Sequence, residues 1–140
     1  QTRDGASGCV THPDTGARTQ DLSGEVLPQA PEFESNVYLQ YLADDVFSGW
    51  SLDSRLDVSF SSEMWMQQDL DDNMRQDSYS QVHASVKLTS PDEKLSVSLI
   101  GRNLSEEAIK NFTLPTPVLY SYYTSLKPPR EFALQLAYRF

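Results

Sequence analysis

The chain has 140 residues, of which 39% are hydrophobic and 22% are charged, and its formal net charge at pH 7 is −9. This length suffices for one ordinary domain. The acidic balance argues against a nucleic-acid partner, because the phosphate backbone requires a basic protein surface. No run of about eighteen apolar residues occurs, so the sequence contains no candidate transmembrane helix.

Residues 1–32 are rich in Gly, Asp, Thr, Ser and Pro, which is the composition of turns and loops. The chain starts at Gln1 without an initiator Met or a signal peptide, so we expect it to be the C-terminal part of a larger protein. Cys9 is the one cysteine. It is either a free thiol in this loop or the partner of a cysteine in the preceding part of the protein.

Alternation of apolar and polar residues predicts five β-strands, because successive side chains of a strand point to opposite faces. The predicted strands are 33–42, 50 to about 66, 78–89, 94–104 and 132–140. In the second strand the face opposite the apolar one carries Asp53, Arg55 and Asp57. Such a face would be the solvated side of a soluble sandwich, or would point into the lumen of a barrel.

The connections between these strands alternate in length. Residues 1–32, 67–77 and 105–129 are long, whereas 43–49 and 90–93 are short. In an up-and-down meander, all long loops then lie at one end and all short turns at the other. Outer-membrane barrels show this asymmetry, with short periplasmic turns and longer outer loops. We therefore expect 1–32 to be an extracellular loop.

The last predicted strand ends the chain on an aromatic residue. Phe132, Leu134, Leu136, Tyr138 and Phe140 share its apolar face. Soluble domains rarely end on an exposed aromatic, because their termini fray into water. A strand whose apolar face meets lipid has a reason to end in this way, at the membrane interface.

Aromatic residues also bracket the apolar rows of three strands, in pairs eight to ten residues apart. At about 3.3 Å per residue and a tilt of about 45°, these rows span roughly 19–23 Å, close to the apolar band of a transmembrane barrel. The predicted lipid-facing girdles are Phe33, Phe60 and Phe132 on the outside and Tyr41, Trp50 and Phe140 on the inside. The sequence thus predicts an all-β fold: an antiparallel up-and-down meander of about five strands, forming a curved open segment of a large transmembrane β-barrel.

Three stretches resemble the C-terminal part of TonB-dependent outer-membrane receptors of the siderophore-receptor type. The stretch Gly101-Arg102-Asn103-Leu104-Ser105-Glu106 is similar to the family's Gly-Lys-Asn-Leu-Thr-Asp, at the end of the penultimate strand. The others are Asp21-Leu22-Ser23-Gly24 with Leu27-Pro28-Gln29-Ala30-Pro31-Glu32, and Pro129-Arg130 with Tyr138-Arg139-Phe140. They follow the family's order over residues 21–140. Gln135 departs from the family, whose barrel-assembly signal often has Gly there.

The resemblance implies a receptor of the bacterial outer membrane, with a barrel of about twenty-two strands and an N-terminal plug. Residues 33–140 would supply its C-terminal strands, and the plug domain would be absent from this chain. Such receptors bind and actively import a scarce nutrient, here expected to be a ferric siderophore. The implied partners are outer-membrane lipid, the barrel-assembly machinery, the nutrient, and TonB through the missing N-terminal region.

Tyr120, Tyr122 and Tyr123 lie in the last predicted outer loop and are candidate ligand-binding residues, because aromatic rings can stack on a ligand. Alternatively, residues 118–123 extend a strand, since Tyr favours β-structure. The residues Asp69, Asp71 and Asp72 are read as a solvated acidic loop, because the Gly and distal Glu of a calcium-binding loop are missing.

No cofactor or metal site is expected, since His12 and His83 lie outside any cluster with ligand spacing. No catalytic motif occurs, so we expect no enzyme activity. Two alternatives to the receptor remain. One is another outer-membrane barrel, such as a porin-like channel or a barrel enzyme. The other is a soluble all-β carbohydrate-binding domain.

Overall fold

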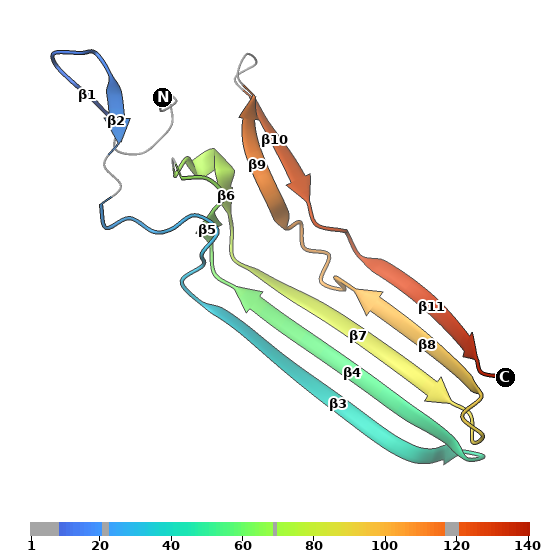
Figure 1. Cartoon of the computed structure of the whole chain (residues 1–140). Coiled ribbons are helices and arrows are strands. Elements are labelled where there is room, and N and C mark those ends of the chain that lie inside the picture. Colours follow the sequence, from blue (N-terminus) through green and yellow to red (C-terminus); the bar gives the residue numbers. More distant parts are fainter. Residues whose placement is uncertain (1–8, 21–22, 69, 117–120) are drawn as a thin grey trace. The chain divides into compact units, whose positions relative to one another are not determined.

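A computed structural model of the chain describes residues 9–20, 23–68, 70–116 and 121–140. The chain divides into two compact units, whose elements are labelled in Figure 1. The sheet unit consists of Glu34–Ser61, Tyr79–Ala108 and Pro128–Phe140. The loop unit consists of Gln1–Phe33, Ser62–Ser78 and Ile109–Lys127. Within the described ranges, no helix is long and apolar enough to cross a membrane.

The sheet unit is one five-stranded antiparallel sheet in which neighbouring strands follow one another along the chain (Figure 1). Its order from edge to edge is β3, β4, β7, β8 and β11. This order confirms the all-β fold and the predicted five-strand meander. The sheet is open, and β3 and β11 form its two edges. The strands are β3 (Glu34–Phe47), β4 (Trp50–Ser61), β7 (Tyr79–Thr89), β8 (Leu95–Arg102) and β11 (Glu131–Tyr138).

The first short turn is tighter than predicted. Phe47 pairs with Trp50, so the turn contains only Ser48 and Gly49, and 43–47 belong to β3 rather than to a turn. Both turn residues have positive φ, at 49° and 82°, as the hairpin turns that match the twist of the strands require. The side chain of Asp45 accepts a hydrogen bond of 2.6 Å from the N–H of Gly49 and stabilises the turn.

The second short turn has the predicted position. In the turn Ser90–Glu93, the N–H of Glu93 donates to the carbonyl of Ser90 at 2.9 Å. The Asp92 carboxylate accepts from the Ser90 hydroxyl at 2.6 Å and from the N–H of Lys94 at 3.2 Å. These hydrogen bonds hold the pKa of Asp92 below its usual value.

The register places the apolar rows of all five strands on one face of the sheet. Leu39 lies opposite Leu56 and Leu56 opposite Ala84, while Leu99 lies opposite both Val86 and Leu134. Directly opposed residues of an antiparallel pair project to the same side. We call this side the apolar face: Val37, Leu39, Tyr41, Leu52, Leu56, Val58, Phe60, Val82, Ala84, Val86, Leu88, Leu95, Val97, Leu99, Phe132, Leu134, Leu136 and Tyr138.

The loop unit contains short strand pairs where the sequence indicated plain connections. The second predicted strand was expected to run to about Met66, which is wrong, because β4 ends at Ser61 and a separate pair follows. The pairs are β1 (Cys9–Thr11) with β2 (Arg18–Gln20), β5 (Met64–Trp65) with β6 (Arg75–Gln76), and β9 (Lys110–Thr116) with β10 (Ser121–Leu126). A 3-10 turn, Asp72–Met74, lies between β5 and β6.

A small core holds the loop unit together. Met66, Leu70, Met74 and Ile109 are buried, and Thr113 is buried beside them in the same unit. These side chains come from two connections that are far apart in the sequence. Because these side chains are buried, the two long connections are packed parts of the structure and are not the plain loops that the sequence had indicated.

Candidate functional site

The apolar face of the sheet unit is exposed. Leu39, Leu134, Leu136 and Phe132 are each 67–71% exposed, although they lie within regular strands. Monomeric soluble proteins seldom expose a continuous apolar surface of this kind, and such surfaces mark contact with a partner or a membrane. The face is therefore the first candidate functional surface.

Aromatic residues gather at one end of this face. Tyr41 of β3 and Leu134 of β11 lie in one cross-strand row, and Phe140 lies six residues beyond Leu134. Four strand spacings of about 4.8 Å make about 19 Å across the sheet, and six residues at about 3.3 Å make about 20 Å along it, so a line from Tyr41 to Phe140 crosses the strands at about 45°. Trp50 and Tyr138 do not follow this line, because they share one cross-strand row.

A second oblique line lies toward the other end of the strands. Phe60 lies opposite Ser80 of β7. Phe132 lies opposite Gly101 of β8, which lies opposite Ala84 of β7, four residues further along that strand than Ser80. Three strand spacings make about 14 Å and four residues about 13 Å, so this line is also inclined at about 45°. Both lines run toward the short turns on going from β3 to β11. The two lines are therefore parallel.

Two contacts between aromatic rings lie at the end of the sheet that carries the short turns. Phe47 stacks on Trp50 with ring centroids 5.7 Å apart, and Tyr138 meets Phe140 edge-on at 5.2 Å. The sequence placed Phe47 in a turn and so did not include it among the girdle residues. Two sequence signals could have found it. Phe47 continues the every-second-residue row of Tyr41, and the turn residues Ser48 and Gly49 follow it directly.

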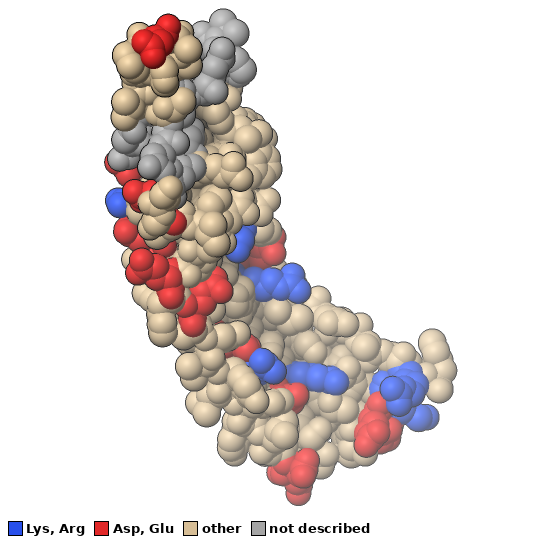
Figure 2. Space-filling view, turned by 60° about the vertical axis from the view of Figure 1, so that its left-hand side comes forward, with Lys and Arg blue, Asp and Glu red and all other residues tan. Residues whose placement is uncertain are grey.

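The opposite side of the sheet, which we call the polar face, carries a network of paired charges. Arg55 binds Asp57 through two hydrogen bonds of 2.8 and 2.6 Å, and its guanidinium lies 4.5 Å from the centre of the Tyr38 ring. Across the strands, Gln40 donates to Asp53 at 2.8 Å, and His83 lies opposite Asp57. Figure 2 shows Lys and Arg side chains beside Asp and Glu side chains. The face is polar and its charges are largely matched.

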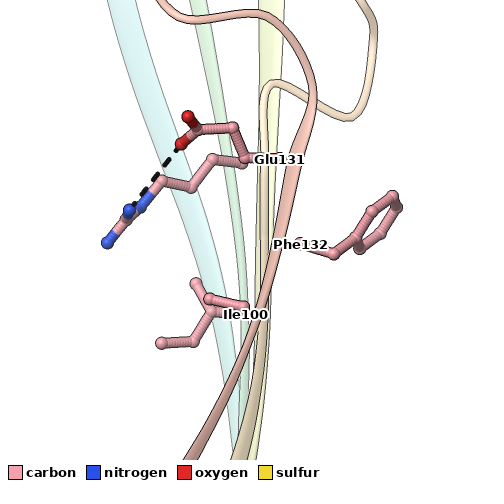
Figure 3. A pocket seen from close by; sticks show the side chains of 5 residues that line it. Ile100, Glu131 and Phe132 are labelled. Carbon is pink, nitrogen blue, oxygen red and sulfur yellow. Dashed lines mark ion pairs between the residues drawn. The ribbon is translucent and has the colours of Figure 1, made fainter.

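A hollow of about 340 Å³ lies at the β8–β11 edge of the sheet. Arg102 and Glu131 form an ion pair of 3.9 Å there, and Ile100 lies beside them, on the same side of the strand as Glu131 and opposite to Phe132 (Figure 3). Ile100 therefore interrupts the polar face, as its sequence position indicated. Both charged side chains are about half exposed, so their pairing contributes little to stability.

Asn103, within the 101–106 stretch that carries the family resemblance, closes the end of β8. It is 2% exposed and has a positive φ of 49°. Its side chain donates to the carbonyls of Glu107 and Pro128 and accepts from the N–H of Glu107. Nearby, Arg130 pairs with Glu106 at 2.7 Å. Two of the three stretches that carry the family resemblance thus contact each other.

Asp71 in the loop unit is buried rather than solvated, which corrects the acidic-loop prediction. It is 1% exposed, and its carboxylate accepts from the backbone and side chain of Asn73 at 2.9 and 2.8 Å and from the Tyr122 hydroxyl at 2.7 Å. These donors satisfy the oxygens of the buried carboxyl group. Asp72 is exposed, as predicted, and Asp69 lies outside the described residues.

The candidate tyrosines have different environments. Tyr122 is 38% exposed and its hydroxyl donates to the buried Asp71, whereas Tyr123 is 58% exposed and packs against Phe112 with ring centroids 5.8 Å apart. Leu114 lies opposite Tyr123 in the β9–β10 pair and is also exposed. Tyr122 and Tyr123 belong to a strand, as the alternative reading of this segment indicated, and Tyr120 lies outside the described residues. Tyr123, Phe112 and Leu114 form the outward surface of this hairpin.

Among the described residues, no group of three or more His, Cys, Asp or Glu side chains could hold a metal ion. Comparisons of the chain with protein-family models, with curated proteins and with solved structures found no match.

Proposed function

We propose that the chain is the C-terminal barrel segment of a TonB-dependent outer-membrane receptor, which binds and actively imports a scarce nutrient, a ferric siderophore. The observation that carries the proposal is the exposed apolar face of the five-stranded sheet, with aromatic residues toward both ends of its strands. Strands of transmembrane barrels tilt by about 35–45°, and aromatic girdles mark both membrane interfaces.

The apolar face would contact outer-membrane lipid. Its middle carries mainly aliphatic and small side chains, and its aromatics lie toward the ends of the strands, except Tyr41, which lies near the middle of β3. Aromatic rings are favoured at membrane interfaces, whereas aliphatic side chains suit the hydrocarbon region. Phe33 precedes β3 and is the third aromatic proposed for the outer girdle.

The polar face would line the barrel interior. Its positive and negative side chains are paired, which suits contact with water or with a folded plug. A pore that selects ions by charge would instead be lined by unpaired charges of one sign. The resemblance of residues 101–106 and of Pro129-Arg130 to the receptor family supports the receptor over a porin-like channel, and the ion pair of Arg130 with Glu106 joins these two stretches. Tyr123, Phe112 and Leu114 are proposed to contact the nutrient, with Tyr122 holding the hairpin.

Cysteine labelling tests the topology. In a Cys9→Ser background, Asp72→Cys should react on intact cells with a maleimide too large to cross the outer membrane. Glu93→Cys, in the short turn, should react only after that membrane is permeabilised. Equal labelling at both positions would contradict the membrane topology.

The complete gene product tests the receptor class separately. We expect a plug of about 120–150 residues upstream of the barrel, the size of an ordinary domain. A short TonB-contacting segment should precede that plug. An upstream region made of barrel strands alone would favour the channel instead.

A further inference from the structure

A small pocket lies in the loop unit, away from the tyrosines. Its volume is about 150 Å³, which is the size of one small chemical group, and it is lined by Val26, Ala30, Glu32, Ser62, Glu63 and Trp65. Two segments form its walls, and backbone hydrogen bonds hold them together. Gln29 N–H donates to the Trp65 carbonyl at 2.7 Å, and Ser62 N–H donates to the Phe33 carbonyl at 2.9 Å. The pocket is therefore preformed.

The charges around this pocket favour a cation. Glu32 and Glu63 both line it, and the chain as a whole carries −9. The nearby cation Arg75 lies 3.4 Å from Glu63 and is shared with Asp77 at 3.5 Å. Two carboxylates repel an anionic ligand and attract a cationic one. Arg75 thus neutralises part of the charge of Glu63, and it is shared with Asp77, so the two carboxylates of the pocket keep a net negative charge.

Trp65 narrows the class of cation. A planar guanidinium stacks on an indole ring and matches carboxylates with its fork of donors, whereas an ammonium is more strongly hydrated. Val26 and Ala30 offer apolar contacts for a short carbon stem. We propose that this pocket binds a guanidinium group on a short apolar stem, carried by an arginine side chain of a peptide or by a free small molecule. This site goes beyond the proposed transport function and does not rest on it.

Tryptophan fluorescence tests the site in the full 140-residue chain. The chain has two tryptophans, so Trp50→Phe leaves Trp65 as the one reporter. Titration with n-propylguanidinium should change its emission in a saturable way, with a Kd on the order of 1 mM. n-Propylurea, which has nearly the same shape without the charge, should produce no saturable change. An equal response to both compounds would overturn the proposal.

Matched carboxylate variants locate the binding. Glu32→Gln and Glu63→Gln should each raise the Kd by about fivefold or more, while Glu25→Gln, an exposed acid outside the pocket, should leave it unchanged. If Trp50→Phe does not fold, the indole N–H resonance of Trp65 in the parent chain serves as the reporter. An unchanged Kd in both pocket variants, or no response of Trp65 in either measurement, would refute the site.

The affinity for a capped arginine dipeptide tells whether the guanidinium group belongs to a peptide or to a free small molecule. At least tenfold tighter binding than n-propylguanidinium supports a peptide partner. Equal binding supports a free small guanidine.

Discussion

Arginine placed at the centre of the apolar face gives the sharpest measure of membrane contact. Leu136 lies four residues from Phe132 and four from Phe140 along the same strand. At about 3.3 Å per residue and a tilt of about 45°, it lies about 9 Å from each aromatic line, at mid-depth between them. An arginine facing lipid at the midplane costs about 2–4 kcal/mol, and one near an interface costs about 0–1 kcal/mol.

Leu136→Arg should therefore lower the folding equilibrium constant of the complete membrane-inserted protein by about 30- to 700-fold, since each 1.4 kcal/mol is a factor of ten. Gln135→Arg is the matched control, because Gln135 lies next to it on the same strand but on the polar face. Phe132→Arg, at the outer line, should cost far less than Leu136→Arg. The assay is urea unfolding from phospholipid vesicles. Equal costs at 135 and 136, or no dependence on depth, would refute membrane contact.

Three further predictions concern the turns and the loop unit. Tyr122→Phe should weaken the loop unit by about 1.5–3 kcal/mol through loss of its hydrogen bond to Asp71, seen as faster amide exchange in β9 and β10, whereas Tyr123→Phe should not. Gly49→Ala should destabilise the β3–β4 hairpin by about 1–2 kcal/mol in thermal unfolding, because φ is +82° and an added Cβ would meet Pro91 at 3.0 Å. Gly24 also has a positive φ but has open space around it, so Gly24→Ala should cost less. The pKa of Asp92 is lowered by its hydrogen bonds, so its stabilisation of the 90–93 turn should be complete above its unfolded value of 3.8 and be lost as the pH falls through its folded value, as amide exchange at Lys94 should report.

The five long strands could be predicted because their alternation runs through whole strands. In β11 every second residue from Phe132 to Tyr138 is apolar, and this pattern alone sets the face. The end of β3 was missed for a local reason. Asp44 and Asp45 read as turn residues, yet the turn itself needs only Ser48 and Gly49 with positive φ.

The loop unit could not be predicted because its structure depends on distant partners. Asp71 and Tyr122 are 51 residues apart, and no local pattern links them. The β9 strand contains Pro115, and its buried central residue is Thr113, whereas its apolar residues Phe112 and Leu114 face outward, so its apolar pattern marks the wrong side as buried. The same dependence on packing explains why Tyr122 and Tyr123, adjacent and chemically identical, have different roles.

The depth of a residue along its strand also bears on the soluble alternative. A second sheet that covered the apolar face would pack with its strands at about 30° or about 90° to these strands. It would cover the face along the whole strand, whereas a membrane gives each residue of a tilted strand its own depth. A covering sheet would also protect Leu136 and Phe132 alike, so only lipid predicts that the cost of arginine falls steeply from one to the other.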